Sequence, residues 1–91
     1  MAEVADLYGA ACAPHVSIGS AIQFAATAQL ALAIPNLLIA EHWIGDNPLG
    51  DAILREPMPQ PVDGYVAVAS GPGLGIRIDE AAVRDLAGAS A

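Results

Sequence analysis

With 91 residues, of which 55% are hydrophobic, the chain has room for one small domain or for part of a larger one. Its formal net charge of −7, with three arginines as the only basic side chains besides histidine, argues against a nucleic-acid partner and an anionic membrane surface, because both attract clustered cations. The single cysteine, Cys12, excludes an internal disulfide and fits a reducing cytoplasm.

The N-terminal segment predicts a short helix followed by an ambiguous stretch. Residues Ala2 to Tyr8 are typical of the last two turns of a helix, and Gly9 is expected to end it. Residues 10–13 have no assignment from propensity, since alanine is depleted in strands. No basic region precedes an apolar stretch here, so we expect no secretory signal.

A second helix is predicted from Ser20. Ser20 is a favourable N-cap, and Gln23 three residues later completes a capping box. The helix should run to about Ile34, because Pro35 disfavours helical geometry at its predecessor. The helix carries apolar or alanine side chains on nearly all of its faces, so we expect it to be packed on more than one side.

A buried strand is expected at residues 37–40, because this continuous apolar run is typical of a strand covered on both faces. Helix, short break and buried strand follow one another as in a βα repeat. The next segment, residues 45–61, should be largely loop, with a helical turn around Asp51 to Arg55.

Two short strands and a closing helix are predicted for the C-terminal part. The strands are Gly64–Ala69 and Leu74–Ile78, joined by a glycine-rich turn, and Asp79 should cap a helix from Glu80 to Ala87. The glycines at residues 71–75 lead into a strand and not a helix. This argues against a phosphate-binding loop, in which a helix N-terminus faces the phosphate.

The apolar run from Ala21 to Ala40 is long enough to suggest a membrane-spanning helix, an interpretation that we reject. Polar residues interrupt its first half, Pro35 breaks its second half, and neither end carries a basic flank.

Polar side chains that could take part in catalysis follow two of these segments. His15 comes after residues 10–13, and Glu41 and His42 come directly after the predicted strand at 37–40. In a parallel α/β barrel, active-site residues sit at the C-terminal ends of the strands, where histidine and a carboxyl group can do general acid/base work. Spacing alone favours the simpler interpretation, two polar loop residues satisfied by backbone groups. A zinc site is weaker still, because no ligand pair has the usual short spacing.

Three motifs carry a family resemblance over nearly the whole chain. The segment at residues 13–22 resembles the seventh-strand region of the mandelate racemase subgroup of the enolase superfamily, and Ala40-Glu41-His42-Trp43 resembles its eighth-strand end. Residues 61–66, followed by Gly71-Pro72-Gly73-Leu74-Gly75-Ile76, are similar to its closing segment. The resemblance implies an α/β fold: the C-terminal portion of a (β/α)7β TIM-like barrel, with its last two strands and the intervening helix, plus the return segment to an α+β capping domain. Residues 1–56 would be the barrel segment and 57–91 the closing segment.

The resemblance also implies roles for individual residues. His15 matches the histidine that acts as general base or acid at the carbon next to a substrate carboxylate, and Glu41 matches the glutamate that hydrogen-bonds that carboxylate. His42 and Trp43 directly follow Glu41, and this position fits residues that line the substrate pocket as well as residues that pack at the barrel rim. The implied reaction starts with removal of the α-proton, with Mg²⁺ as cofactor, and a sugar-acid dehydratase is the main expectation. A racemase or epimerase, a cycloisomerase, or a catalytically inactive truncated fragment are the alternatives.

The departures from the family pattern are as informative. The expected metal ligands, a lysine base and the aspartate partner of the histidine belong to upstream strands that the resemblance does not cover, so no metal ligand is assigned in this chain. Met1 is therefore interpreted as an internal methionine of a longer protein or the start of a truncated reading frame, and the isolated chain is not expected to be active. The parent enzyme is expected to be a cytoplasmic homo-oligomer that acts on a small carboxylate, without nucleic-acid or membrane partners.

Overall fold

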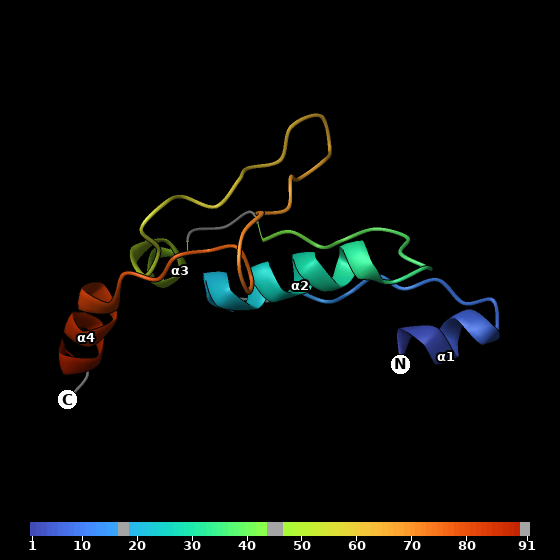
Figure 1. Cartoon of the computed structure of the whole chain (residues 1–91), viewed down its shortest axis with the longest axis horizontal. Helices are drawn as coiled ribbons and strands as arrows, with labels where there is room; N and C mark the ends of the chain where they lie inside the picture. Colours follow the sequence, from blue (N-terminus) through green and yellow to red (C-terminus); the bar gives the residue numbers. More distant parts are fainter. Residues whose placement is uncertain (17–18, 44–46, 90–91) are drawn as a thin grey trace.

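The computed structural model describes residues 1–16, 19–43 and 47–89. Its helices are α1 (Ala2–Leu7), α2 (Ala21–Ala33), α3 (Pro48–Ala52) and α4 (Glu80–Ala89). Within the described ranges, extended segments pair only as single bridges and form no continuous strand. In Figure 1, α2 occupies the middle of the long axis, with α1 and α4 towards opposite ends and residues 55–70 arching over α2.

The N-terminal helix forms as predicted. It ends at Leu7, and the chain turns through Tyr8 and Gly9, whose φ of +72° lies in the left-handed region that glycine tolerates. The amide of Ala10 then donates to the carbonyl of Ala5 at 2.9 Å, which closes the turn. The chain leaves the helix in the direction of residues 10–13.

The central helix has the predicted limits but not the predicted cap. Ser20 and Ile34, which flank α2, are both extended, with ψ of 173° and 144°. The Ser20 side chain makes no capping hydrogen bond, so the predicted capping box is not completed. The Gln23 side chain instead folds back against Gly19, where an added Cβ would lie 1.3 Å from its Oε1 atom.

The expectation that α2 is packed on more than one side is wrong for the described part of the chain. Its buried residues are the small ones, Ala21, Ala25 and Ala31. Leu30 and Leu32 are 51% and 70% exposed. The helix therefore buries one alanine-rich face and leaves its bulky face open.

The predicted buried strand at residues 37–40 is also only partly formed. Leu37 pairs in parallel with Cys12, while Leu38 and Ile39 are 72% and 63% exposed. The described residues supply one paired neighbour for this segment and leave Leu38 and Ile39 largely in solvent. The parallel bridge itself is the arrangement that a βα repeat requires.

The short helix α3 begins three residues before the predicted turn at Asp51–Arg55. Asn47 caps it by accepting a hydrogen bond from the Gly50 amide at 3.1 Å, and Pro48 occupies its first turn. Asparagine at the N-cap followed by proline is the favoured start of a helix. That signal was in the sequence, and it sets the start of the helix.

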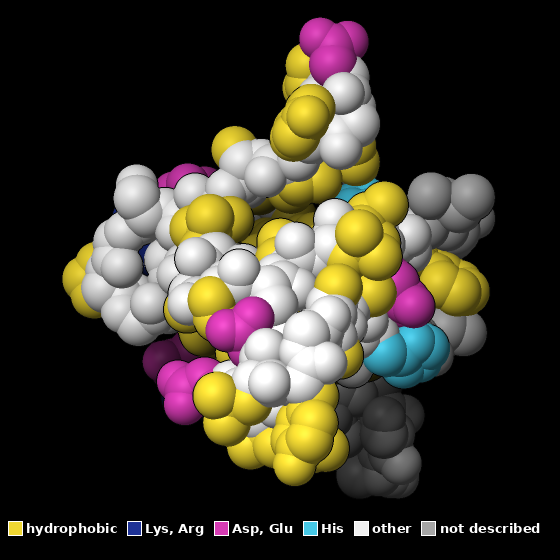
Figure 2. Space-filling model, turned by 90° about the vertical axis from the view of Figure 1, so that its right-hand side faces the viewer, with side chains coloured by type: hydrophobic (Ala, Val, Ile, Leu, Met, Phe, Trp, Pro, Cys, Tyr) yellow, Lys and Arg dark blue, Asp and Glu magenta, His cyan; other side chains and the backbone are white. Residues whose placement is uncertain are grey.

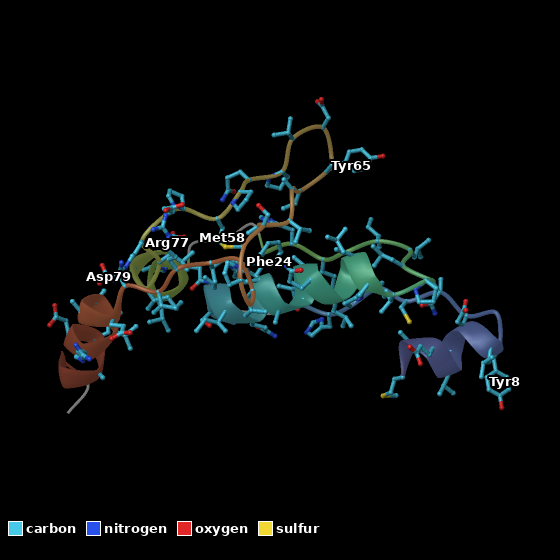
Figure 3. All side chains as sticks on the ribbon, viewed as in Figure 1. Tyr8, Phe24, Met58, Tyr65, Arg77 and Asp79 are labelled. Carbon is cyan, nitrogen blue, oxygen red and sulfur yellow. The ribbon has the colours of Figure 1, made fainter. Side chains whose placement is uncertain are left out.

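The two strands predicted at 64–69 and 74–78 do not form as a pair. Ile78 bridges Leu54 instead, and Val62 bridges Tyr65 around a tight turn in which Asp63 and Gly64 have positive φ. Because Asp63 and Gly64 favour this left-handed turn, the chain reverses before a strand can begin. Figure 3 shows Tyr65 just below the tip of the arch, on its right-hand limb.

The glycine-rich turn lies against α2. Gln29 donates from Nε2 to the carbonyls of Ala69 at 3.0 Å and Leu74 at 3.4 Å. The Gly75 amide donates to Pro72, and a Cβ on Gly75 would lie 2.7 Å from the carbonyl oxygen of Ala69. Glycine is thus required at this close approach.

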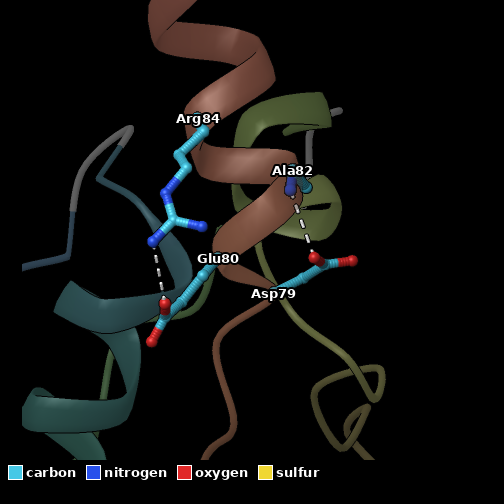
Figure 4. A network of polar contacts seen from close by, with 4 residues as sticks. All are labelled: Asp79, Glu80, Ala82 and Arg84. Atoms are coloured by element: carbon cyan, nitrogen blue, oxygen red, sulfur yellow. Dashed lines mark hydrogen bonds and ion pairs between the residues drawn. The ribbon is translucent and has the colours of Figure 1, made fainter.

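The closing helix confirms the Asp79 cap. Asp79 accepts a hydrogen bond on Oδ1 from the Ala82 amide at 3.1 Å, and Glu80 pairs with Arg84 at 3.4 Å (Figure 4). The helix continues to Ala89, two residues beyond the predicted end, because Gly88 is accommodated within it. Arg77 forms an ion pair with Glu56 beside the Leu54–Ile78 bridge.

The whole chain is extended for its length. Its radius of gyration is 15.0 Å, against about 12 Å for a compact domain of this size. Its accessible surface is 6594 Å², against roughly 4900 Å² for a compact monomer of this mass. Figure 2 shows hydrophobic side chains spread over the visible face. None of the described helices has the length and apolar character needed to cross a bilayer.

Candidate functional site

The parallel bridge sets the register of the two segments that carry the predicted site. The Cys12 amide donates to the carbonyl of Asn36, and the Leu38 amide donates to the carbonyl of Cys12, both at 2.8 Å. His15 lies three residues beyond Cys12 and Glu41 four residues beyond Leu37. Because parallel segments run in the same direction, both side chains reach the same end of the pair.

His15 and Glu41 are in direct contact there. Nδ1 of His15 lies 2.9 Å from Oε2 of Glu41, and the Val16 amide donates to the same oxygen at 2.8 Å. The side chains are 76% and 45% exposed, so solvent reaches the pair. The structure therefore brings together the histidine and the carboxyl group that the sequence predicted at one mouth.

His42 and Trp43, the predicted pocket residues, lie at a cavity next to the His15–Glu41 pair. Both line a cavity of about 360 Å³ at the N-terminal end of α2. Its other lining residues come from the chain before α2 and the start of α2, from α3 and its N-cap, and from the arch: Val16, Gly19, Ser20, Ala21, Gln23, Phe24, Asn47, Gly50, Asp51, Met58, Gln60 and Pro61. Figure 3 labels Phe24 on α2 and Met58 on the arch.

His42 is held by a ring contact. Its imidazole packs edge-on against Phe24, with ring centroids 5.2 Å apart and planes at 84°. Its Nδ1 atom is buried and finds no hydrogen-bond partner among the residues that the structure describes. The contact between His42 and Phe24 thus holds the segment after Glu41 against α2, whereas His15 is open to solvent.

A second, more apolar cavity of about 420 Å³ lies between α2, residues 37–42 and the arch. Glu41 and His42 line one end of it. The remaining lining is dominated by aliphatic side chains of α2 and residues 37–40. Glu41 therefore borders an apolar space on one side and His15 on the other.

Two asparagines that the sequence reading passed over hold this region together. Asn36 donates from Nδ2 to the carbonyls of Ala2 and Ala10, at 3.1 and 2.8 Å, and so ties α1 to the bridge. Asn47 donates to the carbonyl of Gly19 at 2.8 Å and joins the loop after His15 to α3. For Asn47 the signal was its position before Pro48; for Asn36, only the helix break at Pro35 marked the place.

The described residues do not fit a magnesium ion. In residues 1–16, 19–43 and 47–89, no three side chains of histidine, cysteine, aspartate or glutamate gather where they could hold a metal. Asp46 lies outside the described residues. The chemistry available at this site is proton transfer at histidine and hydrogen bonding by a carboxyl group.

Comparisons with known proteins identify what the chain is similar to. Residues 1–82 match the family model described as enolase C-terminal domain-like. D-galactarolactone cycloisomerase of Agrobacterium fabrum (strain C58 / ATCC 33970) is 37% identical over an alignment of 93 positions that covers 93% of this chain. The match spans 24% of that relative, so the chain corresponds to about a quarter of its length. No solved structure matches the chain significantly.

Proposed function

Since this chain belongs to the enolase C-terminal domain-like family, whose fold is of the α/β barrel type, we propose a function for it as part of a larger enzyme. The chain would form one end of an enzyme that removes the α-proton of a carboxylate substrate. Residues 1–56 would form the end of the barrel and residues 57–91 the closing segment. The observation that carries the proposal is the contact between His15 and Glu41 beyond the Cys12–Leu37 bridge. Mg²⁺ would be bound by parts of the enzyme outside this chain.

In this proposal His15 moves the proton. The α-proton of a carboxylate is very weakly acidic, so its removal needs a base at the right carbon and stabilisation of the charge that develops. Histidine changes protonation state near neutral pH and can both take and return a proton. His42 and Trp43 would line the pocket that holds the substrate.

The relative's name favours a cycloisomerase that acts on a sugar-acid lactone. After loss of the α-proton, the electron pair of the C–H bond forms a double bond to the β-carbon and expels the oxygen there. If that oxygen belongs to a lactone ring, the leaving group stays attached and the reaction is an isomerisation. If it is a free hydroxyl, protonation releases water and the reaction is a dehydration.

The same elimination thus serves both the cycloisomerase and the sugar-acid dehydratase predicted from the sequence. What differs is the oxygen on the β-carbon. We place the cycloisomerase first because the 37% identical relative carries that name. Product mass distinguishes the two: an isomer of the substrate, or the substrate less one water.

A chimera tests the role of His15. The matched quarter of the Agrobacterium cycloisomerase is replaced by this chain, and exchange of the substrate α-proton is followed by NMR in D₂O with D-galactarolactone and Mg²⁺. We expect exchange in the chimera and a loss of about a hundredfold or more in His15→Asn, because general acid/base groups contribute that much.

Glu3→Gln on the exposed face of α1 is the matched control, and a chimera with this change should exchange the substrate proton at the normal rate. Circular dichroism establishes that both variants fold like the chimera. Exchange at the parental rate in a folded His15→Asn chimera would remove His15 from the mechanism.

A further inference from the structure

The Asn47 side chain connects two sides of the cavity at the N-terminal end of α2. One side is the chain that runs from Gly19 into α2, another is formed by His42, Trp43 and α3, and the arch completes the lining. Asn47 precedes α3 and donates from Nδ2 to the carbonyl of Gly19 at 2.8 Å. Its Oδ1 atom accepts the Gly50 amide at 3.1 Å. We call the hydrogen bond from Nδ2 to Gly19 the Asn47 clamp.

The two hydrogen bonds of Asn47 need different chemical groups. The bond from the Gly50 amide is a helix N-cap, which aspartate and serine provide as well as asparagine does. The clamp needs a donor at the end of the side chain. An ionised aspartate only accepts hydrogen bonds, and the serine hydroxyl is attached one carbon nearer to the backbone. Asparagine is therefore the capping residue that also reaches across the cavity.

Gly50 leaves room for this amide group. Glycine is unfavourable in a helix relative to alanine, yet it occupies the third position of α3, where it is buried. A Cβ atom on Gly50 would lie 2.6 Å from Nδ2 and 2.9 Å from Cγ of Asn47. The glycine thus weakens α3 as a helix and allows Asn47 to reach Gly19.

We infer that Asn47 is a positioning residue of the substrate pocket: its clamp holds the start of α2 to α3 and so sets the width of the cavity between them. This rests on the proposed function only in taking the cavity as the substrate pocket. His15 and Glu41 are held by other contacts, to each other and to the Val16 amide. Loss of the clamp therefore weakens substrate binding and leaves the proton-transfer step unchanged.

The single tryptophan of the chain reports the clamp without any activity. Trp43 lines the cavity and is 38% exposed, and its quenching by acrylamide is measured at nanomolar concentration, where association of the chain is least. Asn47→Asp and Asn47→Ser keep the cap and lose the clamp, and only the first adds a charge. We expect the quenching constant to rise in both, and also in Gly50→Ala, although alanine favours the helix. Asp79→Ala removes the N-cap of α4, away from the cavity, and should be quenched like the wild type.

The chimera with the Agrobacterium cycloisomerase tests the consequence for the substrate. The rate of α-proton exchange is measured as a function of D-galactarolactone concentration. We expect KM to rise about fivefold in Asn47→Asp and Asn47→Ser, the equivalent of one hydrogen bond, with kcat within about twofold of the parental value. Asp79→Ala should change neither quantity.

Wild-type quenching of Trp43 in both Asn47 variants would overturn the clamp. A fall in kcat with unchanged KM would overturn the positioning role in the pocket. The two measurements also separate this inference from the proposed function. A rise in quenching with a chimera that exchanges no proton, even with Asn47 in place, would reject the proposed function and keep the clamp. Exchange that needs His15 but has a KM independent of Asn47 would do the reverse.

Discussion

Single polar side chains set the geometry of the site. The Asn36 amide group reaches the carbonyls of Ala2 and Ala10 and the sulfur of Cys12, while its backbone carbonyl accepts from the Cys12 amide. One residue therefore connects α1, the segment before His15 and the segment before Glu41. The register that brings His15 to Glu41 depends on it, although it touches neither.

Replacing Asn36 should loosen the bridge. Asn36→Ala removes the donor to two carbonyls, and we expect the Cys12 and Leu38 amides to exchange with solvent about five- to thirtyfold faster, since hydrogen bonds of this kind contribute about 1 kcal/mol each. Asn36→Asp should be at least as disruptive, because it places acceptor oxygens against those carbonyls. Hydrogen exchange followed by NMR measures both.

Gln60→Ala is the control for Asn36, because Gln60 is exposed and donates only to the nearby carbonyl of Met58 among the described residues. Unchanged exchange at Cys12 and Leu38 in both Asn36 variants would show that the bridge holds without this side chain.

At the scale of elements, local signals were readable from the sequence and long-range pairing was not. The ends of α1 and α2 and the start of α4 follow from Gly9, Pro35 and Asp79, which act on the backbone next to them. The strand predictions at 64–69 and 74–78 depended on partners that hydrophobic pattern cannot name, and Ile78 pairs with Leu54. Propensity did not assign residues 10–13; Cys12 pairs there with Leu37, a distant segment, and Asn36 contacts the Cys12 sulfur beside the bridge.

In the candidate site, too, some features could be predicted from the sequence and others could not. His15 and Glu41 were found because each follows a segment that the family resemblance aligns, and their contact follows from the parallel register. The cavity beside His42 was not predictable, since it is built from α2, α3 and the arch, which meet only in three dimensions. A sequence pattern locates residues along one segment, but it does not show which other segments form the opposite wall of a cavity.

The helix α4 is capped by Asp79 and is packed on little else among the described residues. A ten-residue helix is marginal without tertiary packing, and most side chains of α4 are exposed. We expect Asp79→Ala to cost about 1 kcal/mol and to shift the helix–coil balance about fivefold towards coil. Carbon-13 chemical shifts of residues 80–89 report the helical fraction.

Asp79→Asn tests the cause, because asparagine caps helices as well as aspartate does. It should preserve the helix if the hydrogen bond to the Ala82 amide is what matters. Equal loss in both variants would point to the charge of Asp79 instead.

For the whole molecule, the decisive feature is the apolar surface left open. Leu32, Leu38 and Ile39 are each more than 60% exposed, and they lie on α2 and the segment beside it. In a barrel such residues face neighbouring strands and helices. The family assignment and the match to a quarter of a relative's length explain why a chain with this pattern buries so little.

This surface predicts how the 91-residue chain behaves alone. Exposed apolar patches and open extended edges promote association, so we expect the chain to bind an apolar fluorescent dye and to sediment as concentration-dependent oligomers at micromolar concentrations. Ile39→Lys should lower both dye binding and the sedimentation coefficient, because it places a charge in the patch. Ala81→Lys on the exposed side of α4 makes the same charge change without touching the patch. Equal behaviour of the two variants would place the association elsewhere on the molecule, and a monomeric wild type without dye binding would mean that the chain shields Leu38 and Ile39 by itself.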